Sequence, residues 1–266
     1  FMIEKYLVKK ITEPVDWKIT VPGSKSMTNR ALLMAVLSAG TVRVEGVLFS
    51  DDSRHFLACL VALGFTVEIE EEKKCVTVTG CSGRIPRGEA VIDVGSAGTA
   101  ARFLAAMLGF SDGCYEIRCS AQMKRRPMAE LFDLLSGAGA KITFLEEEGH
   151  LPVRITGCRY ARADKTAGET PRELSLDITK STQFLSALLL IAPMVPEGMK
   201  IHITSEKTDG SYIRITRKMM QEFGVSVAFD GRDYEVPCRS SYRKETYMVE
   251  PDMSAACYFY AAAAVT

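Results

Sequence analysis

The sequence has few of the residues that metal and redox sites need. Only three histidines occur, and their spacing contains no pair typical of a zinc or iron site. The eight cysteines include no C-x-x-C pair, and no cationic, apolar leader precedes the first expected strand. We therefore expect no metal, no cofactor, reduced thiols and a cytoplasmic location.

Net charge and long apolar runs are also missing. The 33 Lys and Arg residues balance 33 Asp and Glu residues, so no overall field attracts nucleic acid or an anionic membrane. None of the apolar runs reaches the roughly 18 residues of a membrane span. We therefore expect neither a nucleic acid nor a membrane as partner. The 266 residues are 47% hydrophobic, enough for one large domain or two smaller ones.

One local design occurs three times: a short strand runs into a polar turn, and the turn opens an apolar helix. The turns are Val21-Pro22-Gly23-Ser24-Lys25-Ser26, Val94-Gly95-Ser96-Ala97-Gly98-Thr99 and Ile178-Thr179-Lys180-Ser181-Thr182-Gln183. Glycines at near-equal spacing, Gly64, Gly139 and Gly224, end a second, amphipathic helix in each unit. The three units are therefore in register.

Each glycine precedes an alternating run that predicts a half-buried strand, and a turn and another strand follow. The runs are 65–69, 140–144 and 225–229, and the last strands are 75–79, 151–155 and 234–236. We predict an α/β fold of three strand-helix-strand-helix-strand-strand units around a shared core. The first helix of each unit is apolar nearly all round and should be buried, whereas the second should cover the outside.

The three polar turns predict an anion site. A helix N-terminus has unpaired backbone N–H groups and the positive end of the helix dipole. Three such termini that meet at one cleft would bind phosphate or carboxylate groups without a metal.

The end of the chain repeats the start of a unit. A strand-like run, 246–249, leads through Glu250-Pro251-Asp252 into an apolar helix in which the sequence stops. Phe259 has the place that Phe103 and Phe184 have in their units. We therefore predict a fragment of a longer chain.

The chain resembles the 5-enolpyruvylshikimate-3-phosphate synthases. The resemblance depends on Pro22-Gly23-Ser24-Lys25-Ser26 with Asn29-Arg30, Ser50-Asp51-Asp52, Ala97-Gly98-Thr99-Ala100 with Arg102, Met123-Lys124 with Arg126-Pro127, Ser181 with Gln183-Phe184-Leu185, and Glu250, Asp252 and Tyr258-Phe259. It implies a monomeric enzyme with two inside-out α/β lobes of three βαβαββ units each, the enolpyruvyl transferase fold. Residues 18–238 would form one complete lobe, and residues 1–17 and 239–266 an incomplete part of the other.

The resemblance also implies the reaction and the site. Such enzymes transfer the enolpyruvyl group of phosphoenolpyruvate to shikimate 3-phosphate by addition and elimination. Residues implied for shikimate 3-phosphate are Lys25, Ser26, Arg30, Ser181, Thr182, Gln183 and Tyr212. Those implied for phosphoenolpyruvate are Lys25, Gly98, Arg126 and Gln183, and Lys25 is the implied catalytic residue. The family's acid and lysine for proton transfer lie beyond Thr266, so we expect binding of shikimate 3-phosphate with negligible turnover.

Several alternatives stay open. A UDP-N-acetylglucosamine enolpyruvyl transferase shares the fold but has Lys-Asn where this chain has Lys25-Ser26, and a non-catalytic phosphate-binding domain fits the same motifs. A P-loop needs glycine where Ser24 lies, and an RNA-phosphate-handling relative lacks support from surface charge. Among single residues, Arg102 could be a structural ion-pair partner and Tyr212 a buried tyrosine. Asp209 replaces a usual serine and would repel a phosphate nearby.

Overall fold

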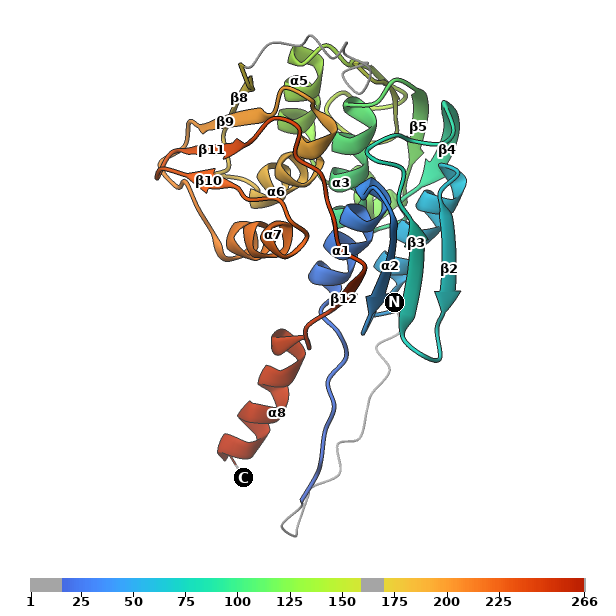
Figure 1. Ribbon diagram of the computed structural model, residues 1–266, viewed down its shortest axis with the longest axis vertical. Helices are drawn as coiled ribbons and strands as arrows, with labels where there is room; N and C mark the ends of the chain where they lie inside the picture. The colour runs from blue at the N-terminus through green and yellow to red at the C-terminus, as the bar shows by residue number, and fades with distance from the viewer. Residues whose placement is uncertain (1–15, 159–169, 266) are drawn as a thin grey trace.

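The computed structural model describes residues 16–158 and 170–265, which form three small sheets around a group of central helices (Figure 1). The expected units appear in order along the chain. The first contains α1 (Lys25–Leu37), β1 (Thr41–Glu45), α2 (Asp51–Ala62), β2 (Thr66–Glu70) and β3 (Cys75–Thr79). The second contains β4 (Glu89–Asp93), α3 (Gly98–Gly109), β5 (Cys114–Arg118), α4 (Ala121–Lys124), α5 (Ala129–Gly137), β6 (Lys141–Phe144) and β7 (Val153–Thr156).

The third unit contains β8 (Arg172–Leu176), α6 (Thr182–Ile191), the 3-10 turn η2 (Ala192–Met194), β9 (Met199–Ile203), α7 (Ser211–Glu222), β10 (Ala228–Phe229) and β11 (Asp233–Val236). The chain continues through β12 (Thr246–Met248) into α8 (Met253–Val265). The expected α/β class is confirmed.

The three sheets share one topology. Their strand orders are β12-β1-β3-β2, β4-β5-β7-β6 and β8-β9-β11-β10. In each sheet the first pair is parallel and the other two pairs are antiparallel. The repeated order shows that the near-equal spacing in the sequence reflects three structurally equivalent units.

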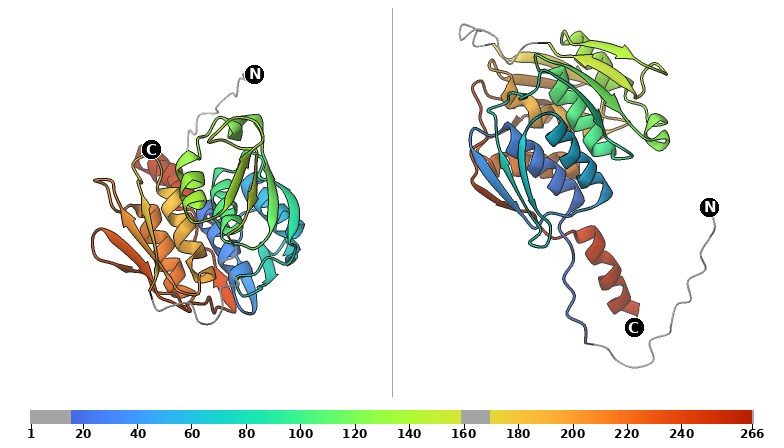
Figure 2. Two further views of the ribbon diagram at one scale, coloured as in Figure 1. Left: turned by 90° about the horizontal axis from the view of Figure 1, so that it is seen from above. Right: turned by 90° about the vertical axis from the view of Figure 1, so that its right-hand side faces the viewer.

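The first helix of each unit lies inside, and the sheets lie outside. Helices α1, α3 and α6 contact one another between the sheets (Figure 2). Every residue of α1 from Met27 to Leu37 is buried, and so is every residue of α6 from Phe184 to Ile191. The second helices, α2, α5 and α7, bury one side only, as their amphipathic patterns predict.

The glycines after these second helices explain how the chain turns from each helix into the next strand. Gly64, Gly139 and Gly224 have φ values of 92°, 100° and 90°. L-residues with side chains rarely adopt this left-handed conformation, so glycine ends the helix without strain.

The prediction of a strand before the first turn is wrong. Residues 16–22 contain no strand, and only a single bridge joins Gly23 to Pro251. The place beside β1 is taken by β12, which pairs with β1 in parallel. Burial gives the reason: Tyr247 in β12 is 3% exposed and packs on Phe223, whereas Trp17 is 62% exposed. Thus the first sheet includes residues from beyond the boundary expected at 238.

Helix α8 forms as expected but packs little. It extends away from the three sheets (Figure 1), and most of its apolar side chains are exposed. Among the described residues, Ala256 is its one buried side chain. No helix in the described ranges has the length and apolar character to cross a membrane. Residues 1–15 of the expected remnant 1–17 lie outside the described residues.

Candidate functional site

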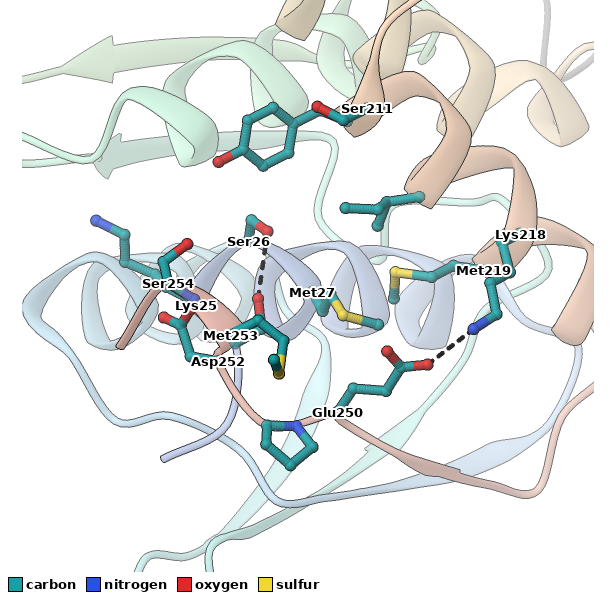
Figure 3. A pocket seen from close by; sticks show the side chains of 14 residues that line it. Lys25, Ser26, Met27, Ser211, Lys218, Met219, Glu250, Asp252, Met253 and Ser254 are labelled. Atoms are coloured by element: carbon teal, nitrogen blue, oxygen red, sulfur yellow. Dashed lines mark hydrogen bonds and ion pairs between the residues drawn. The ribbon is translucent and has the colours of Figure 1, made fainter. Parts of the chain in front are cut away.

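A pocket of about 510 Å³ lies beside the N-terminus of α1 (Figure 3). Its walls are the first turn of α1, one side of α7 and the segment 250–254. Backbone bonds hold that segment against the turn: the N–H of Ser24 donates to the Glu250 carbonyl at 2.9 Å. The pocket therefore depends on chain segments far apart in the sequence.

Lys25 is the first residue of α1 and lines this pocket. Its Nζ lies 3.2 Å from Asp52 Oδ2, and its side chain is 51% exposed. The positive end of the α1 dipole does not stabilise a cation such as Lys25. Asp52, in contrast, lies in the first turn of α2, where the helix dipole stabilises a carboxylate. Asp52 therefore holds the ammonium at the rim, within reach of a ligand.

Arg30 lies one turn further into the core and is 2% exposed. Its Nε donates to Thr216 Oγ1 at 2.8 Å, and another guanidinium nitrogen donates to the Ser26 carbonyl at 2.9 Å. Among the described residues no carboxylate pairs with it. Burial lowers the pKa of Arg30 to about 10. A buried cation that lacks a carboxylate is expensive unless an anion binds nearby.

A second group of cations lies at the N-terminus of α3. A Cβ on Gly98 would lie 2.6 Å from Nη1 of Arg126 and 3.0 Å from Nη1 of Arg102, so both guanidinium groups approach Gly98. Arg102 is 8% exposed, and its Nε has no hydrogen-bond partner. Burial, with a smaller effect of Arg126, lowers the pKa of Arg102 to about 10. Two converging cations around bare backbone can bind a phosphate or carboxylate group.

The described residues give no support to the ion-pair interpretation of Arg102. None of the described carboxylates pairs with it; it donates to the Gly98 carbonyl at 2.9 Å and lies over the Phe184 ring at 5.5 Å. The buried-tyrosine alternative for Tyr212 is wrong, because its side chain is 49% exposed and lines the Lys25 pocket.

The start of α6 is a capped helix end. The hydroxyl of Ser181 accepts from the Gln183 N–H at 3.2 Å, so its own proton remains available to a ligand. Thr182 lies next to the loop before α7, because a Cβ on Gly210 would lie 3.5 Å from Thr182 Cγ2. The start of α6 thus borders α7, which carries Tyr212.

Two arginines, Arg30 of α1 and Arg102 of α3, join the N-terminal halves of the three inner helices. The guanidinium of Arg30 in α1 lies 5.3 Å from the Phe103 ring in α3, and that of Arg102 lies over Phe184 in α6. Arg30 also donates to Ser186 of α6 at 3.4 Å. These contacts place the N-terminal halves of α1, α3 and α6 beside one another.

The predicted residues do not all line one hollow. Lys25, Ser26 and Tyr212 line the pocket of Figure 3, with Arg30 buried behind them. The residues outside its lining are Gly98, Arg126, Ser181, Thr182 and Gln183. The structure therefore presents the predicted residues as neighbouring groups rather than as one closed cavity.

Comparison with known proteins identifies the family. A family model described as EPSP synthase (3-phosphoshikimate 1-carboxyvinyltransferase) matches residues 9–266. The chain belongs to the EPSP synthase family.

Curated relatives and a solved structure agree with the EPSP synthase match. The 3-phosphoshikimate 1-carboxyvinyltransferase of Trichormus variabilis is 36% identical over 97% of this chain and 59% of its own length. The protein of the same name from Sulfurovum sp. is 41% identical over 94% of this chain and 57% of its own. The structure of EPSP synthase from Acinetobacter baumannii matches with a TM-score of 0.75 at 24% identity, over 91% of this chain and 51% of that one. The fold is therefore that of EPSP synthase, and the chain spans about three fifths of these curated relatives.

Asp209, the departure from the EPSP synthase pattern, is neutralised within the chain. Its Oδ2 lies 2.7 Å from Nη1 of Arg214, and Tyr234 donates to its Oδ1 at 3.3 Å. Burial by itself would raise its pKa, but bonds from the Gly210 N–H and Arg214 keep the pKa below its ordinary value. The carboxylate thus stays charged and paired, which removes the repulsion expected from its sequence position.

Sequence reasoning missed several groups around the site. Asp52 belongs to the motif Ser50-Asp51-Asp52, but sequence reasoning assigned it no role in the site. An acid in the first turn of a helix is a signal that could have pointed to it. Thr216 and Ser186, which hold Arg30, give no local signal, because their contacts join helices distant in sequence.

Proposed function

We propose that this chain is the substrate-binding portion of an enzyme that transfers the enolpyruvyl group of phosphoenolpyruvate to the 5-hydroxyl of shikimate 3-phosphate. One observation carries the proposal: Arg30 and Arg102, buried on neighbouring inner helices, have no carboxylate partner among the described residues. Such an arrangement is stable when anionic substrates supply the missing charge.

The two cation groups suit the two substrates. Shikimate 3-phosphate would lie in the Lys25 pocket, with Ser26 and Tyr212 around the ring, Arg30 behind it, and Ser181, Thr182 and Gln183 at the start of α6. Phosphoenolpyruvate would lie at Gly98, where backbone and Arg126 can approach its phosphate or carboxylate. Two unit charges 4 Å apart repel by roughly 4 kcal/mol at an effective dielectric near 20. Lys25 between the substrates would offset that repulsion.

The reaction itself needs more than these residues. The sugar hydroxyl adds to C2 of phosphoenolpyruvate while C3 gains a proton, and phosphate then leaves. In this proposal the chain binds and orients the two substrates. The acid and base that move the protons would come from the rest of the enzyme, so this chain alone turns over negligibly. The monomeric state, the cytoplasmic location and the division into two lobes remain predictions.

Calorimetric titration with shikimate 3-phosphate tests the proposal. We expect saturable binding by the unchanged chain and loss of at least about tenfold in affinity with Lys25→Ala, since a charge-assisted contact contributes about 1.5–3 kcal/mol. Lys141→Ala, at an exposed lysine on β6, is the matched control and should bind normally.

Three results would contradict the proposal. They are no heat with folded, unchanged protein; equal affinity for the Lys25→Ala and Lys141→Ala variants; and binding of UDP-N-acetylglucosamine in place of shikimate 3-phosphate. The last result would assign the chain to the alternative transferase.

A further inference from the structure

The side of α7 next to the one that lines the Lys25 pocket carries a second group of cations. A pocket of about 400 Å³ is lined there by Arg214, Arg217, Lys218 and Gln221, with Ser226 and Val227 from the following segment. Arg217 and Lys218 lie three and four positions after Arg214, and Gln221 lies one turn further, so the four residues form one stripe on the helix. No carboxylate lines this pocket.

Two of the three cations have acidic partners outside the lining. Arg214 pairs with Asp209, and Lys218 Nζ lies 2.9 Å from Glu250 Oε1. Arg217 pairs with none of the described carboxylates. The lining therefore has an excess of positive charge.

Arg217 is also held in place before any ligand arrives. Its Nη2 donates to the Val227 carbonyl at 3.1 Å, and its guanidinium lies 5.4 Å from the Phe229 ring and 5.8 Å from the Tyr234 ring. Its Nε is buried and has no hydrogen-bond partner. A fixed, planar guanidinium loses little conformational entropy when it binds an oxyanion.

We propose that this pocket on α7, the α7 pocket, is a second anion site that takes a small dianion with phosphate chemistry. Arg217 would be its fixed donor, and Arg214 and Lys218 would add the flanking charges. The proposal goes beyond the enolpyruvyl transfer proposed above, because none of the residues assigned there to a substrate lines the α7 pocket.

The α7 pocket is connected to the Lys25 pocket by one side chain. Lys218 lines both pockets, and its partner Glu250 belongs to the segment that walls the Lys25 pocket (Figure 3). An anion in the α7 pocket competes with Glu250 for the Lys218 ammonium. Occupancy therefore weakens the ion pair that joins α7 to the segment 250–254.

Amide NMR titration of the labelled chain locates the binding. Inorganic phosphate is added at constant ionic strength, and a parallel titration uses glycerol 3-phosphate. We expect the Gln221, Ser226 and Val227 signals to shift and saturate. Tighter binding of inorganic phosphate assigns the site to the free ion, and tighter binding of glycerol 3-phosphate assigns it to phosphate monoesters.

Variants separate a site from general surface charge. Gln221→Glu adds a carboxylate to the lining at an exposed position and should weaken binding about tenfold. Ser136→Glu adds the same charge to an exposed position of α5, the equivalent helix of the second unit, and should leave binding unchanged. Glu250→Gln should tighten binding severalfold, because it frees Lys218.

The proposal is overturned if the shifts do not saturate, if Gln221→Glu and Ser136→Glu behave alike, or if only signals around Lys25 and Gly98 respond. An Arg217→Gln variant gives a second check. Its melting temperature is measured first, and if it is folded it should lose the Ser226 and Val227 shifts.

Discussion

Arg102 is the residue where ligand binding and stability conflict most clearly. Its buried guanidinium has an unpaired Nε and lies near the like charge of Arg126. Replacing a poorly compensated buried charge by an apolar side chain is often stabilising. We expect Arg102→Met to raise the free energy of unfolding of the ligand-free chain by about 1 kcal/mol. Urea denaturation measures this, with the exposed Arg84→Met as control. A lower stability would show that Arg102 is satisfied without an anion.

Asp52 and Asp51 are adjacent acids with different expected roles. Both lie in the first turn of α2, but the structure pairs Lys25 with Asp52. We expect Asp52→Asn to weaken binding of shikimate 3-phosphate severalfold, because the ammonium loses the partner that holds it at the rim. Asp51→Asn removes the same charge from the same turn and should bind normally. Calorimetry of both variants decides, and Asp52→Glu should restore part of the affinity. Equal effects of the two asparagine variants would indicate a general charge effect.

At the scale of elements, β12 decides where the folded unit ends. It pairs with β1 and buries Tyr247 against Phe223. A chain that ends at residue 238 loses this strand and leaves β1 as an open edge. We expect it to unfold at lower urea concentration than a chain that ends at residue 252, by about 3 kcal/mol or more in free energy. Tyr247→Ala in the longer chain should reproduce much of the loss. Equal stability of the two truncated chains would place β12 outside the folded unit.

At the scale of the whole molecule, α8 is an apolar helix with little to cover it. Tyr258 is 79% exposed and Tyr260 is 67% exposed. Large exposed apolar surfaces promote association. We expect the 266-residue chain to self-associate with rising concentration and a chain that ends at residue 252 to do so much less. Analytical ultracentrifugation measures both. Equal behaviour would assign any association to another surface.

The carboxylates give the whole molecule an acid-sensitive stability. Ion pairs and hydrogen bonds keep the pKa values of Glu70, Glu116, Glu130 and Asp233 below their ordinary values. The folded chain therefore binds fewer protons than the unfolded chain around pH 4. This stabilisation is present above the ordinary pKa values and is lost as pH falls through the lowered ones. We expect the free energy of unfolding to fall between about pH 5 and pH 3, less steeply at high salt because water and ions reach these half-buried groups. A constant stability over this range would contradict the assignment.

Much of the architecture could be predicted from local patterns. Strand β3 has the predicted bounds, Cys75–Thr79, because a period of two is visible within a short window. The glycines at 64, 139 and 224 marked the helix ends, because their backbone conformation excludes most other residues. The prediction of a strand before Lys25 was wrong for the opposite reason. Its sequence permits a strand, but the place beside β1 is taken by β12, a segment more than 200 residues away in the sequence.

The sequence by itself determined the three equivalent units, the buried inner helices and the polar turns that open them, because periodicity, glycine conformation and helix ends are local properties. The tertiary structure decided which strand completes the first sheet, which hydroxyl groups hold Arg30, and which two arginines meet at Gly98. Those outcomes depend on contacts between distant segments that compete for the same buried space. Local patterns contain no information about the result of that competition.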